Sequence, residues 1–379
     1  MLVADEKILN IVVPMAGRGS RFAQAGFDKP KPLILLGGIP MIQWVINNIR
    51  PARAHRFIFV CLKEHIEANS EVPEALNRLC PGCIIVKVDQ VTEGAACTVL
   101  LAREYIDNEC PLMIANSDQY VELPIDRYLA ALDIPDVSGL IMTFWADHPK
   151  WSYCRMNKDG TVAEVVEKKV ISNEATVGLY NFRYGKDFVS SADEMIKRNL
   201  RVNNEFYVAP AYNLLIEKGG KIVVRQTGRE YAGMYGLGTP DDYEFFQTTS
   251  QFQSDCPREY VSPYFSEQVR HAKLAHFYAL FFNTKNRSGL EALLHEDVRF
   301  TGVGKNLLGR RAVLARINDL QAAGSYRCEP LLPDTKDDED AKVLEYETLS
   351  GKRHSCRNLV FSWVGDMISE IRSDLVETL

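Results

Sequence analysis

The chain has 379 residues, of which 46% are hydrophobic and 25% are charged. This composition is typical of an ordinary globular protein and argues against both a disordered chain and a membrane-spanning one. The formal net charge of −6 at pH 7 argues against a nucleic-acid backbone as the main partner. At this length two domains are expected, on a prior of roughly 150 residues for each.

The nine cysteines show no regular spacing, and their number is odd. The sequence therefore predicts reduced, mostly buried thiols rather than a disulfide framework. Cys80 and Cys83 form a C-x-x-C pair, but no second pair follows, and a structural zinc site needs four ligands. Because no apolar segment of the signal-peptide kind follows the first residues, a cytoplasmic location is expected.

The first predicted element is an apolar strand at Ile11–Val13, which breaks into a loop of small residues followed by cations. Gly17 and Gly19 allow backbone N–H groups to approach an anion without a Cβ in the way. Arg21 and Lys31 supply countercharge where a triphosphate would lie. The stretch therefore predicts a phosphate-binding loop, with a glycine turn before a solvated basic loop as the alternative.

Two familiar glycine loops do not fit this stretch. A Walker loop needs Gly-Lys-Ser/Thr after its second glycine, and a dinucleotide fingerprint needs a third glycine where Phe22 stands. The stretch resembles the signature of the sugar-phosphate nucleotidyltransferase superfamily, Gly-x-Gly-Ser/Thr-Arg followed by Pro-Lys-x-Leu. The resemblance implies an α/β fold with a Rossmann-like (GT-A-like) mixed sheet. It also implies that nucleotide is bound by Ala16, Gly17, Gly19 and Ser20, with Arg21 and Lys31 as catalytic cations.

Further along the chain, Pro40 is placed to open a helix whose apolar residues recur at helical spacing. Strands are then predicted at Phe57–Leu62, Ile84–Val88, Leu112–Ala115 and Leu140–Phe144. The alternation of strands with helical segments predicts a parallel α/β sheet. Ligands gather at the carboxyl ends of such strands, so Gly17, Gln90 and Asp118 are expected at one site.

The turn Gln90–Ala96 lies between the strand Ile84–Val88 and a helix predicted over Cys97–Ile106. In the resembled superfamily a Gln and a Gly-Ala turn at this place contact the nucleotide base. The resemblance therefore implies that role for Gln90, Gly94 and Ala95. An ordinary turn at a helix N-terminus is the alternative.

Asp118 follows the strand Leu112–Ala115, where the resembled superfamily places its Mg²⁺-binding aspartate. Mg²⁺, or Mn²⁺ in its place, takes one or two carboxylates with phosphate oxygens and water, so a single aspartate is chemically reasonable. A helix N-cap aspartate is the alternative. Many relatives carry a second metal-binding aspartate two residues before the glycine of a closing Gly-Thr-Pro turn. This chain has Gly236 at that position.

The alternation of strands and helices ends at a hairpin, which is predicted from Tyr153–Met156 and Val162–Glu167. The resemblance implies that acceptor-side residues follow it. Lys168 would meet the acceptor phosphate, and the acceptor pocket would also contain Gly178, Glu205 and Tyr207. Taken alone, the Glu167-Lys168 pair would be interpreted as a surface charge pair.

The expected division of the chain is a nucleotidyltransferase domain over 1–251, a linker over 252–266 and a second domain over 267–379. The linker segment mixes Ser, Asp, Pro and Glu without periodicity. Val269–Asn283 then predicts an aromatic-rich helix, and the acidic run Asp337–Asp340 predicts a solvated loop. The segments L-H-E-D-V-R-F, G-R-R-A and G-D-M-I-S-E-I-R resemble the NTF2-like (SnoaL-like) family, which implies an α+β cone domain.

Together the resemblances imply transfer of a nucleoside monophosphate from an NTP to a phosphorylated sugar, polyol or related acceptor, with release of pyrophosphate. The motifs are closest in style to bacterial capsule-pathway enzymes, which favours CTP. A glycosyltransferase is one alternative, although Asn116-Ser117-Asp118 holds only one carboxylate of the usual Asp-x-Asp. A non-enzymatic nucleotide or ligand sensor is the other. A homodimer through the second domain is expected, because its last two strands hold more apolar surface than one helix covers.

Overall fold

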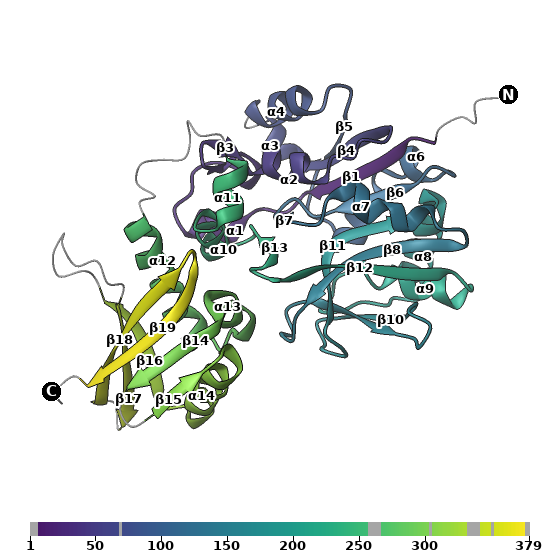
Figure 1. The fold of residues 1–379 in the computed structure, drawn as a ribbon. Coiled ribbons are helices and arrows are strands. Elements are labelled where there is room, and N and C mark those ends of the chain that lie inside the picture. The colour runs from purple at the N-terminus through teal and green to yellow at the C-terminus, as the bar shows by residue number, and fades with distance from the viewer. Residues whose placement is uncertain are drawn as a thin grey trace. The chain divides into compact units, whose positions relative to one another are not determined.

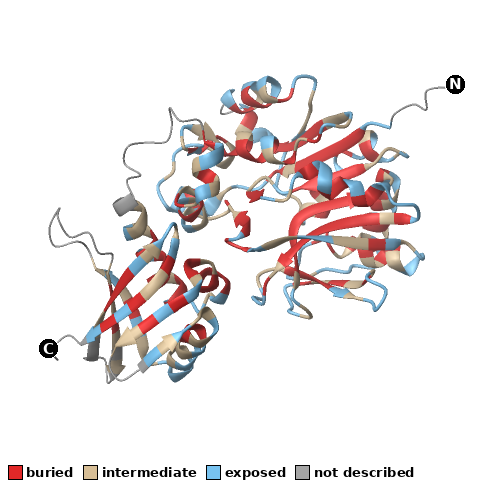
Figure 2. Cartoon of the chain, in the orientation of Figure 1, coloured by how far each residue is buried: buried red, intermediate tan, exposed pale blue. Residues whose placement is uncertain are grey.

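The computed structural model describes residues 7–67, 70–256, 267–302, 305–331, 342–349 and 352–375. The chain divides into two compact units, Met1–Pro240 and Asp241–Leu379. Figure 1 shows their elements, and Figure 2 shows which residues are buried. Within these ranges, none of the helices combines the length and the apolar character that crossing a bilayer requires.

One mixed sheet of eleven strands forms the centre of the first unit. Its strands in spatial order are β5 (Ile84–Val88), β4 (His55–Leu62), β1 (Leu9–Met15), β6 (Leu112–Ala115), β11 (Glu174–Phe182), β8 (Val137–Trp145), β12 (Lys221–Glu230), β13 (Gly233–Gly236) and β7 (Gln119–Val121). The hairpin of β9 (Ser152–Met156) and β10 (Val162–Glu167) joins this sheet at β11. β2 (Leu35–Leu36) and β3 (Ile39–Pro40) pair separately.

The predicted strand positions and the hairpin are confirmed, but the prediction of a parallel sheet holds only for part of it. β5, β4, β1 and β6 are parallel neighbours. β11, which comes later in the chain than β8, lies between β6 and β8 and runs antiparallel to both. The spacing of apolar residues indicates where a strand lies but not which strand it pairs with.

Helices cover both faces of this sheet (Figure 1). They are α1 (Ser20–Gln24), α2 (Met41–Ile49), α3 (Lys63–Glu67), α4 (Glu71–Leu79), α5 (Ala95–Leu100), α6 (Arg103–Ile106), α7 (Ile125–Leu129), α8 (Gly185–Lys197) and α9 (Ala211–Glu217), with the 3-10 turns Lys31–Leu33 and Ala130–Asp133. Ile11 and Val13 of β1 pack in one apolar core with residues of α2, whereas Val12 packs in the other with residues of α5 and α8. This alternation follows from the period of two along a strand. The single helix predicted over Cys97–Ile106 is two short helices, α5 and α6.

The second unit is an α+β structure with one sheet of six strands. The spatial order is β15 (Lys305–Leu308), β14 (Leu294–Gly302), β19 (Met367–Leu375), β18 (Lys352–Val364), β17 (Lys342–Leu349) and β16 (Tyr326–Leu331). Its helices are α10 (Pro240–Gln247), α11 (Ser250–Asp255), α12 (Glu267–Asn283), α13 (Arg287–Leu293) and α14 (Arg310–Ala323). The α+β character agrees with the expectation, and assignment to the NTF2-like family stays a prediction.

The division between the units falls earlier in the chain than the expected boundary at residue 251. Phe245 of α10 packs against Phe277 and Phe281 of α12, with ring centroids 5.0 and 5.7 Å apart. The first residues of the expected linker are helical, because α11 runs to Asp255 and buries Phe252. Residues 257–266 of the linker and the acidic run Asp337–Asp340 lie outside the described residues.

Candidate active site

The glycine loop follows directly from the carboxyl end of β1 and leads into α1. Gly19 has φ +64°, in the left-handed region, and a Cβ there would lie 3.2 Å from the Cβ of Lys31. A side chain at Gly17 would meet no atom within 4 Å. Position 19 therefore requires glycine for its backbone and for the close approach of Lys31, whereas position 17 is simply open.

A cavity of 380 Å³ lies where the loops after β1, β5 and β6 come together. This is the edge of the sheet at which ligands of α/β proteins gather. Of the predicted site residues, the ones that line it are Ala16, Gly17, Gly19, Lys31, Gly94, Ala95, Asp118 and Glu205. Ala16 and Glu205, 189 positions apart in the sequence, thus belong to one site, which no local pattern could show.

Lys31 and Asp118 form an ion pair inside this cavity, and 19% and 31% of their side chains are exposed. Asp118 lies in the loop between β6 and β7, and a Cβ at Gly238 would come within 2.9 Å of its Oδ2. This carboxylate fits the single-aspartate type of magnesium site, in which phosphate oxygens and water complete the coordination. In the part of the chain that is described, no three His, Cys, Asp or Glu residues group into a metal site.

Gly236, which stands where many relatives have the second aspartate, is the last residue of β13. It pairs with Gln119 of β7 in an antiparallel register. The next residue, Leu237, donates its backbone N–H to the carbonyl of Asp118 at 2.7 Å. Position 236 is thus one ladder step from Asp118, and a carboxylate is missing there.

The turn before α5 is locked to the segment that contains Phe206. The N–H of Ala96 donates to the Phe206 carbonyl at 3.0 Å, and the N–H of Phe206 donates to the Glu93 carbonyl at 2.8 Å. Gly94 has φ +126°, and a Cβ there would lie 2.5 Å from the Phe206 oxygen. This turn has glycine because another backbone packs directly against it.

A second cavity of 190 Å³ adjoins the first, and Ala95 and Asn116 line both. It contains three of the predicted acceptor-side residues, Lys168, Gly178 and Tyr207, while Glu205 lines the first cavity instead. Its lining also includes residues that the sequence did not single out, namely Asn116, Lys150, Trp151, Ser152, Thr176 and Tyr180.

Lys168 is held by several contacts at this second cavity. Its φ is +57°, a left-handed conformation that is uncommon for a residue other than glycine. Its Nζ donates to the Lys150 carbonyl at 2.8 Å, and it lies 3.6 Å from Glu167 and 5.6 Å from the centre of the Tyr207 ring. A cation fixed in this way at a cavity wall is suited to an anionic group of a ligand.

Glu167 and Tyr207 supply titratable groups beside Lys168. Glu167 is buried, which raises the pKa of its carboxyl, and the Ser152 hydroxyl donates a hydrogen bond to it. Burial, together with the neighbouring Glu205 carboxylate, raises the pKa of Tyr207 to about 12. Tyr207 is therefore a neutral hydroxyl at physiological pH, able to donate or accept a hydrogen bond.

Asn116 is the most central residue that sequence reasoning missed. A Cβ at Gly178, which has φ +103°, would lie 2.2 Å from the Asn116 Nδ2, so that glycine makes room for this amide. The N–H of Asn116 donates to the Gly178 carbonyl at 3.0 Å. Its place at the end of β6, two residues before Asp118, was the signal that could have identified it.

Three predicted residues lie outside both cavity linings in the described structure. Ser20 and Arg21 are exposed on α1, and Gln90 is exposed after β5. The other cations of the loop are paired at the surface, Arg18 with Glu64 at 3.8 Å and Lys29 with Glu71 at 3.5 Å.

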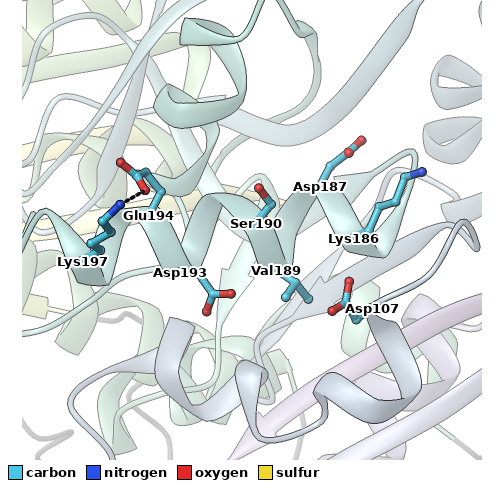
Figure 3. A pocket seen from close by; sticks show the side chains of 8 residues that line it. All are labelled: Asp107, Lys186, Asp187, Val189, Ser190, Asp193, Glu194 and Lys197. Atoms are coloured by element: carbon cyan, nitrogen blue, oxygen red, sulfur yellow. Dashed lines mark ion pairs between the residues drawn. The ribbon is translucent and has the colours of Figure 1, made fainter.

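A larger hollow of 590 Å³ runs along α8 and contains no predicted site residue. Figure 3 shows its charged lining, including the ion pair of Glu194 with Lys197 at 3.7 Å. Lys186 pairs with Glu109 at 2.8 Å, and Asp193 pairs with Arg103. Mutually paired charges of both signs are typical of a solvated helix surface rather than a ligand site.

Comparison with known proteins places this site in a family context. Residues 11–206, more than half of the chain, match the family model described as Nucleotidyl transferase. The chain is 25% identical over 224 residues to a UTP–glucose-1-phosphate uridylyltransferase of Haloferax volcanii, which covers 56% of this chain and 86% of that protein. It is 23% identical over 178 residues to the bifunctional protein GlmU of Methanococcus aeolicus, which covers 46% of this chain and 40% of that protein.

Solved structures show the same fold for the first unit. The nucleoside-diphosphate-sugar pyrophosphorylase of Vibrio cholerae has a TM-score of 0.55 and 25% identity, covering 63% of this chain and 100% of that one. The inositol-1-phosphate CTP transferase of T. maritima has a TM-score of 0.51 and 15% identity, covering 66% of this chain and 98% of that one. With its glycine loop, Lys31 and Asp118 assembled at one cavity, the chain belongs to the nucleotidyl transferase family.

Proposed function

We propose that this protein transfers a nucleoside monophosphate from an NTP to a phosphorylated sugar, polyol or related small molecule, with release of pyrophosphate. The observation that supports this most is the pair of adjoining cavities. One is lined by the glycine loop, Lys31 and Asp118, and the other by Lys168 and Glu167. Since Asn116 and Ala95 line both, two ligands bound there would meet at their shared wall.

The proposed reaction is an in-line displacement at the α-phosphorus. An oxygen of the acceptor phosphate forms a bond to that phosphorus, and the bond to the pyrophosphate oxygen breaks. No proton has to move, so the task of the protein is alignment and charge neutralisation. Lys31 would neutralise the α-phosphate. The backbone N–H groups of Gly17 and Gly19 would donate hydrogen bonds to phosphate oxygens. Arg21, on α1, would bind the leaving pyrophosphate.

Asp118 would hold Mg²⁺, or Mn²⁺, in this proposal. The bound ion would add positive charge against the triphosphate oxygens. Lys31 and Asp118 neutralise each other when the cavity holds no ligand. When a metal nucleotide binds, a phosphate group would replace Asp118 as the partner of Lys31, and the metal ion would replace Lys31 as the partner of Asp118.

On the acceptor side, Lys168 would bind the acceptor phosphate, with Glu167, Glu205 and Tyr207 holding hydroxyl groups. Gly178 keeps the wall open beside Asn116. Names of similar proteins, which include a glucose-1-phosphate and an inositol-1-phosphate enzyme, support a phosphorylated sugar or polyol. We favour CTP as the donor and a role in surface-polysaccharide or capsule precursor synthesis. We also propose that the second unit pairs two chains into a homodimer.

The test is pyrophosphate release from each of the common NTPs, measured against a panel of sugar and polyol phosphates with Mg²⁺. Release that depends on both an NTP and a phosphorylated acceptor is expected. Consumption of a nucleotide-sugar without any pyrophosphate would instead indicate a glycosyltransferase. Nucleotide binding without turnover of any pair would indicate a sensor.

A further inference from the structure

The larger of the two adjoining cavities has charged residues at one part of its wall and neutral residues at another. Lys31 and Asp118 supply charges beside the glycine loop, and Glu205 is the third charged residue of the lining. The turn after β5 and the start of α5 contribute only neutral residues to the lining, namely Val91, Thr92, Gly94, Ala95 and Thr98. A nucleoside triphosphate that places its phosphates at the charged part therefore places its base or ribose against this turn.

Two hydroxyl groups of the turn hydrogen-bond to each other. Thr92 Oγ1 lies 2.6 Å from Thr98 Oγ1, and it lies 3.0 Å from the Gly94 carbonyl. Thr98 Oγ1 lies 3.3 Å from the same carbonyl, which also accepts the Thr98 N–H at 3.1 Å. Thr98 is buried, with 6% of its surface exposed, whereas Thr92 is only partly buried.

Counting protons shows what this pair can offer to a ligand. Each hydroxyl has one proton and two acceptor lone pairs. If Thr92 donates to Thr98, Thr98 donates to the Gly94 carbonyl. If Thr98 donates to Thr92, Thr92 donates to that carbonyl. In both arrangements the two protons are used between Thr92, Thr98 and Gly94. The oxygen of Thr92, a residue that lines the cavity, keeps at least one free lone pair.

We propose that Thr92 reads the exocyclic amino group of the nucleotide base, with Thr98 and Gly94 holding its hydroxyl as an acceptor. This inference rests on the proposed function, and it identifies the donor as a nucleotide whose base carries an amino group, such as CTP. Uracil presents a carbonyl at the corresponding position, so binding UTP would require Thr92 to give up its bond within the turn. Gln90, the residue expected from the sequence to contact the base, is exposed outside the lining.

CTP and UTP form the matched pair for the test, because their rings have the same size and differ at this group. Binding of each nucleotide with Mg²⁺ to the full-length protein is measured by calorimetry. CTP is expected to bind about tenfold more tightly than UTP, the difference that one net hydrogen bond produces. Thr92→Val should weaken CTP about tenfold and leave UTP unchanged, while Thr92→Ser, which keeps the hydroxyl, should retain the preference.

Thermal unfolding of each variant shows whether the fold is intact, and Thr92→Ala serves as a second variant should valine disturb the turn. Equal or tighter binding of UTP by the native protein overturns the inference. Equal loss of CTP and UTP affinity in Thr92→Val does so too, since Thr92 would then touch a part common to both. Selective CTP binding without pyrophosphate release from any acceptor would leave the inference standing and overturn the proposed function. Absence of binding by any nucleotide overturns both.

Discussion

Lys31 and Asp118 contact each other although the proposed reaction gives them separate ligands. Both side chains are partly exposed, so water screens a charge left without its partner, and that state costs less than it would in a closed interior. Their mutual contact avoids that cost when no nucleotide is bound. A metal nucleotide would exchange it for a phosphate on Lys31 and a cation on Asp118, and the net charge around each group would change little.

Removal of either partner should therefore affect turnover far more than folding. Lys31→Ala and Asp118→Asn are each expected to lower the rate of pyrophosphate release at least about a hundredfold, the usual effect of losing one transition-state contact. Lys197→Ala on α8, whose side chain is 79% exposed, is the matched lysine control and should retain full activity. Near-native rates in either site variant would contradict the assignment of these roles.

The glycine at position 236 gives a second prediction, in the direction of gain. Gly236 pairs with Gln119, beside the metal-binding candidate Asp118, so a carboxylate at 236 would supply a second hard ligand. Gly236→Asp is expected to tighten Mn²⁺ binding in the absence of nucleotide by about tenfold or more. Titration of Mn²⁺ followed by electron paramagnetic resonance measures this. In Gly236→Asp/Asp118→Asn the gain should disappear, and an unchanged affinity in the single variant would show that the two positions do not share an ion.

Glu167 gives a prediction for the dependence of stability on pH. Burial raises its pKa in the folded protein above the ordinary value of 4.5. The folded state then holds its proton more tightly than the unfolded state, so the contribution of Glu167 to stability falls as pH rises from that ordinary value to the folded-state pKa. Glu167→Gln can still accept a hydrogen bond from Ser152. The melting temperature of this variant minus that of the native protein should therefore be higher at pH 7 than at pH 4. Glu164→Gln on the same strand, which pairs with Arg155 at the surface, should show little of this pH dependence.

How far single residues could be predicted depended on whether their signal was local. Gly17, Gly19 and Lys31 stand within one short stretch, and Asp118 directly follows an apolar strand, so the pattern itself indicated them. Asn116, Trp151 and Ser152 became part of the site only through the pairing of β6, β9 and β11. No spacing in the chain expresses that proximity.

At the scale of elements, the positions of strands were predictable and their order was not. β4, β5, β6 and β8 lie where apolar runs indicated them. Insertion of β11 between β6 and β8 brings Gly178 to Asn116, and thereby joins the acceptor cavity to the nucleotide cavity. Tertiary pairing decides that arrangement, and the pairing of β6 with β11 joins residues more than sixty positions apart.

The packing of the Gly94 turn on Phe206 can be tested at this scale. A methyl group at position 94 would meet the Phe206 backbone at 2.5 Å and would sit on a residue with φ +126°. Gly94→Ala should therefore destabilise the first unit by at least about 2 kcal/mol, the cost of a strained backbone plus a displaced neighbour. Gly17→Ala, which meets open space, should leave the unfolding midpoint almost unchanged even if it impairs activity. Denaturant unfolding of the two variants compares them directly, and equal midpoints would refute the packing argument.

At the scale of the whole molecule, the family match concerns the first unit, since the matched residues end at 206. The second unit buries more of its apolar surface by itself than the sequence suggested. Phe361, Ile368 and Ile371 are buried, and Trp363 stacks on His271 with centroids 4.5 Å apart. Fewer apolar residues of the last two strands are therefore left for a partner sheet than the sequence predicted.

Of the large apolar residues in β18 and β19, Val364 and Met367 are exposed, to 55% and 39%, and they lie at the turn between the two strands. If this turn belongs to an interface between two chains, the full-length protein should be a dimer by light scattering, and Val364→Asp with Met367→Lys should shift it toward monomer without changing its melting temperature much.

A fragment ending at residue 240 should be monomeric and folded, because the Vibrio cholerae protein is matched over 100% of its length by 63% of this chain. A fragment that ends at 240 leaves out Phe245 and Phe252, which are buried and belong to the second unit. Pyrophosphate release by the fragment at a rate comparable to that of the full chain would assign pairing to the second unit and chemistry to the first. A monomeric full-length protein would refute the pairing role, and a folded but inactive fragment would show that the second unit contributes to the active site.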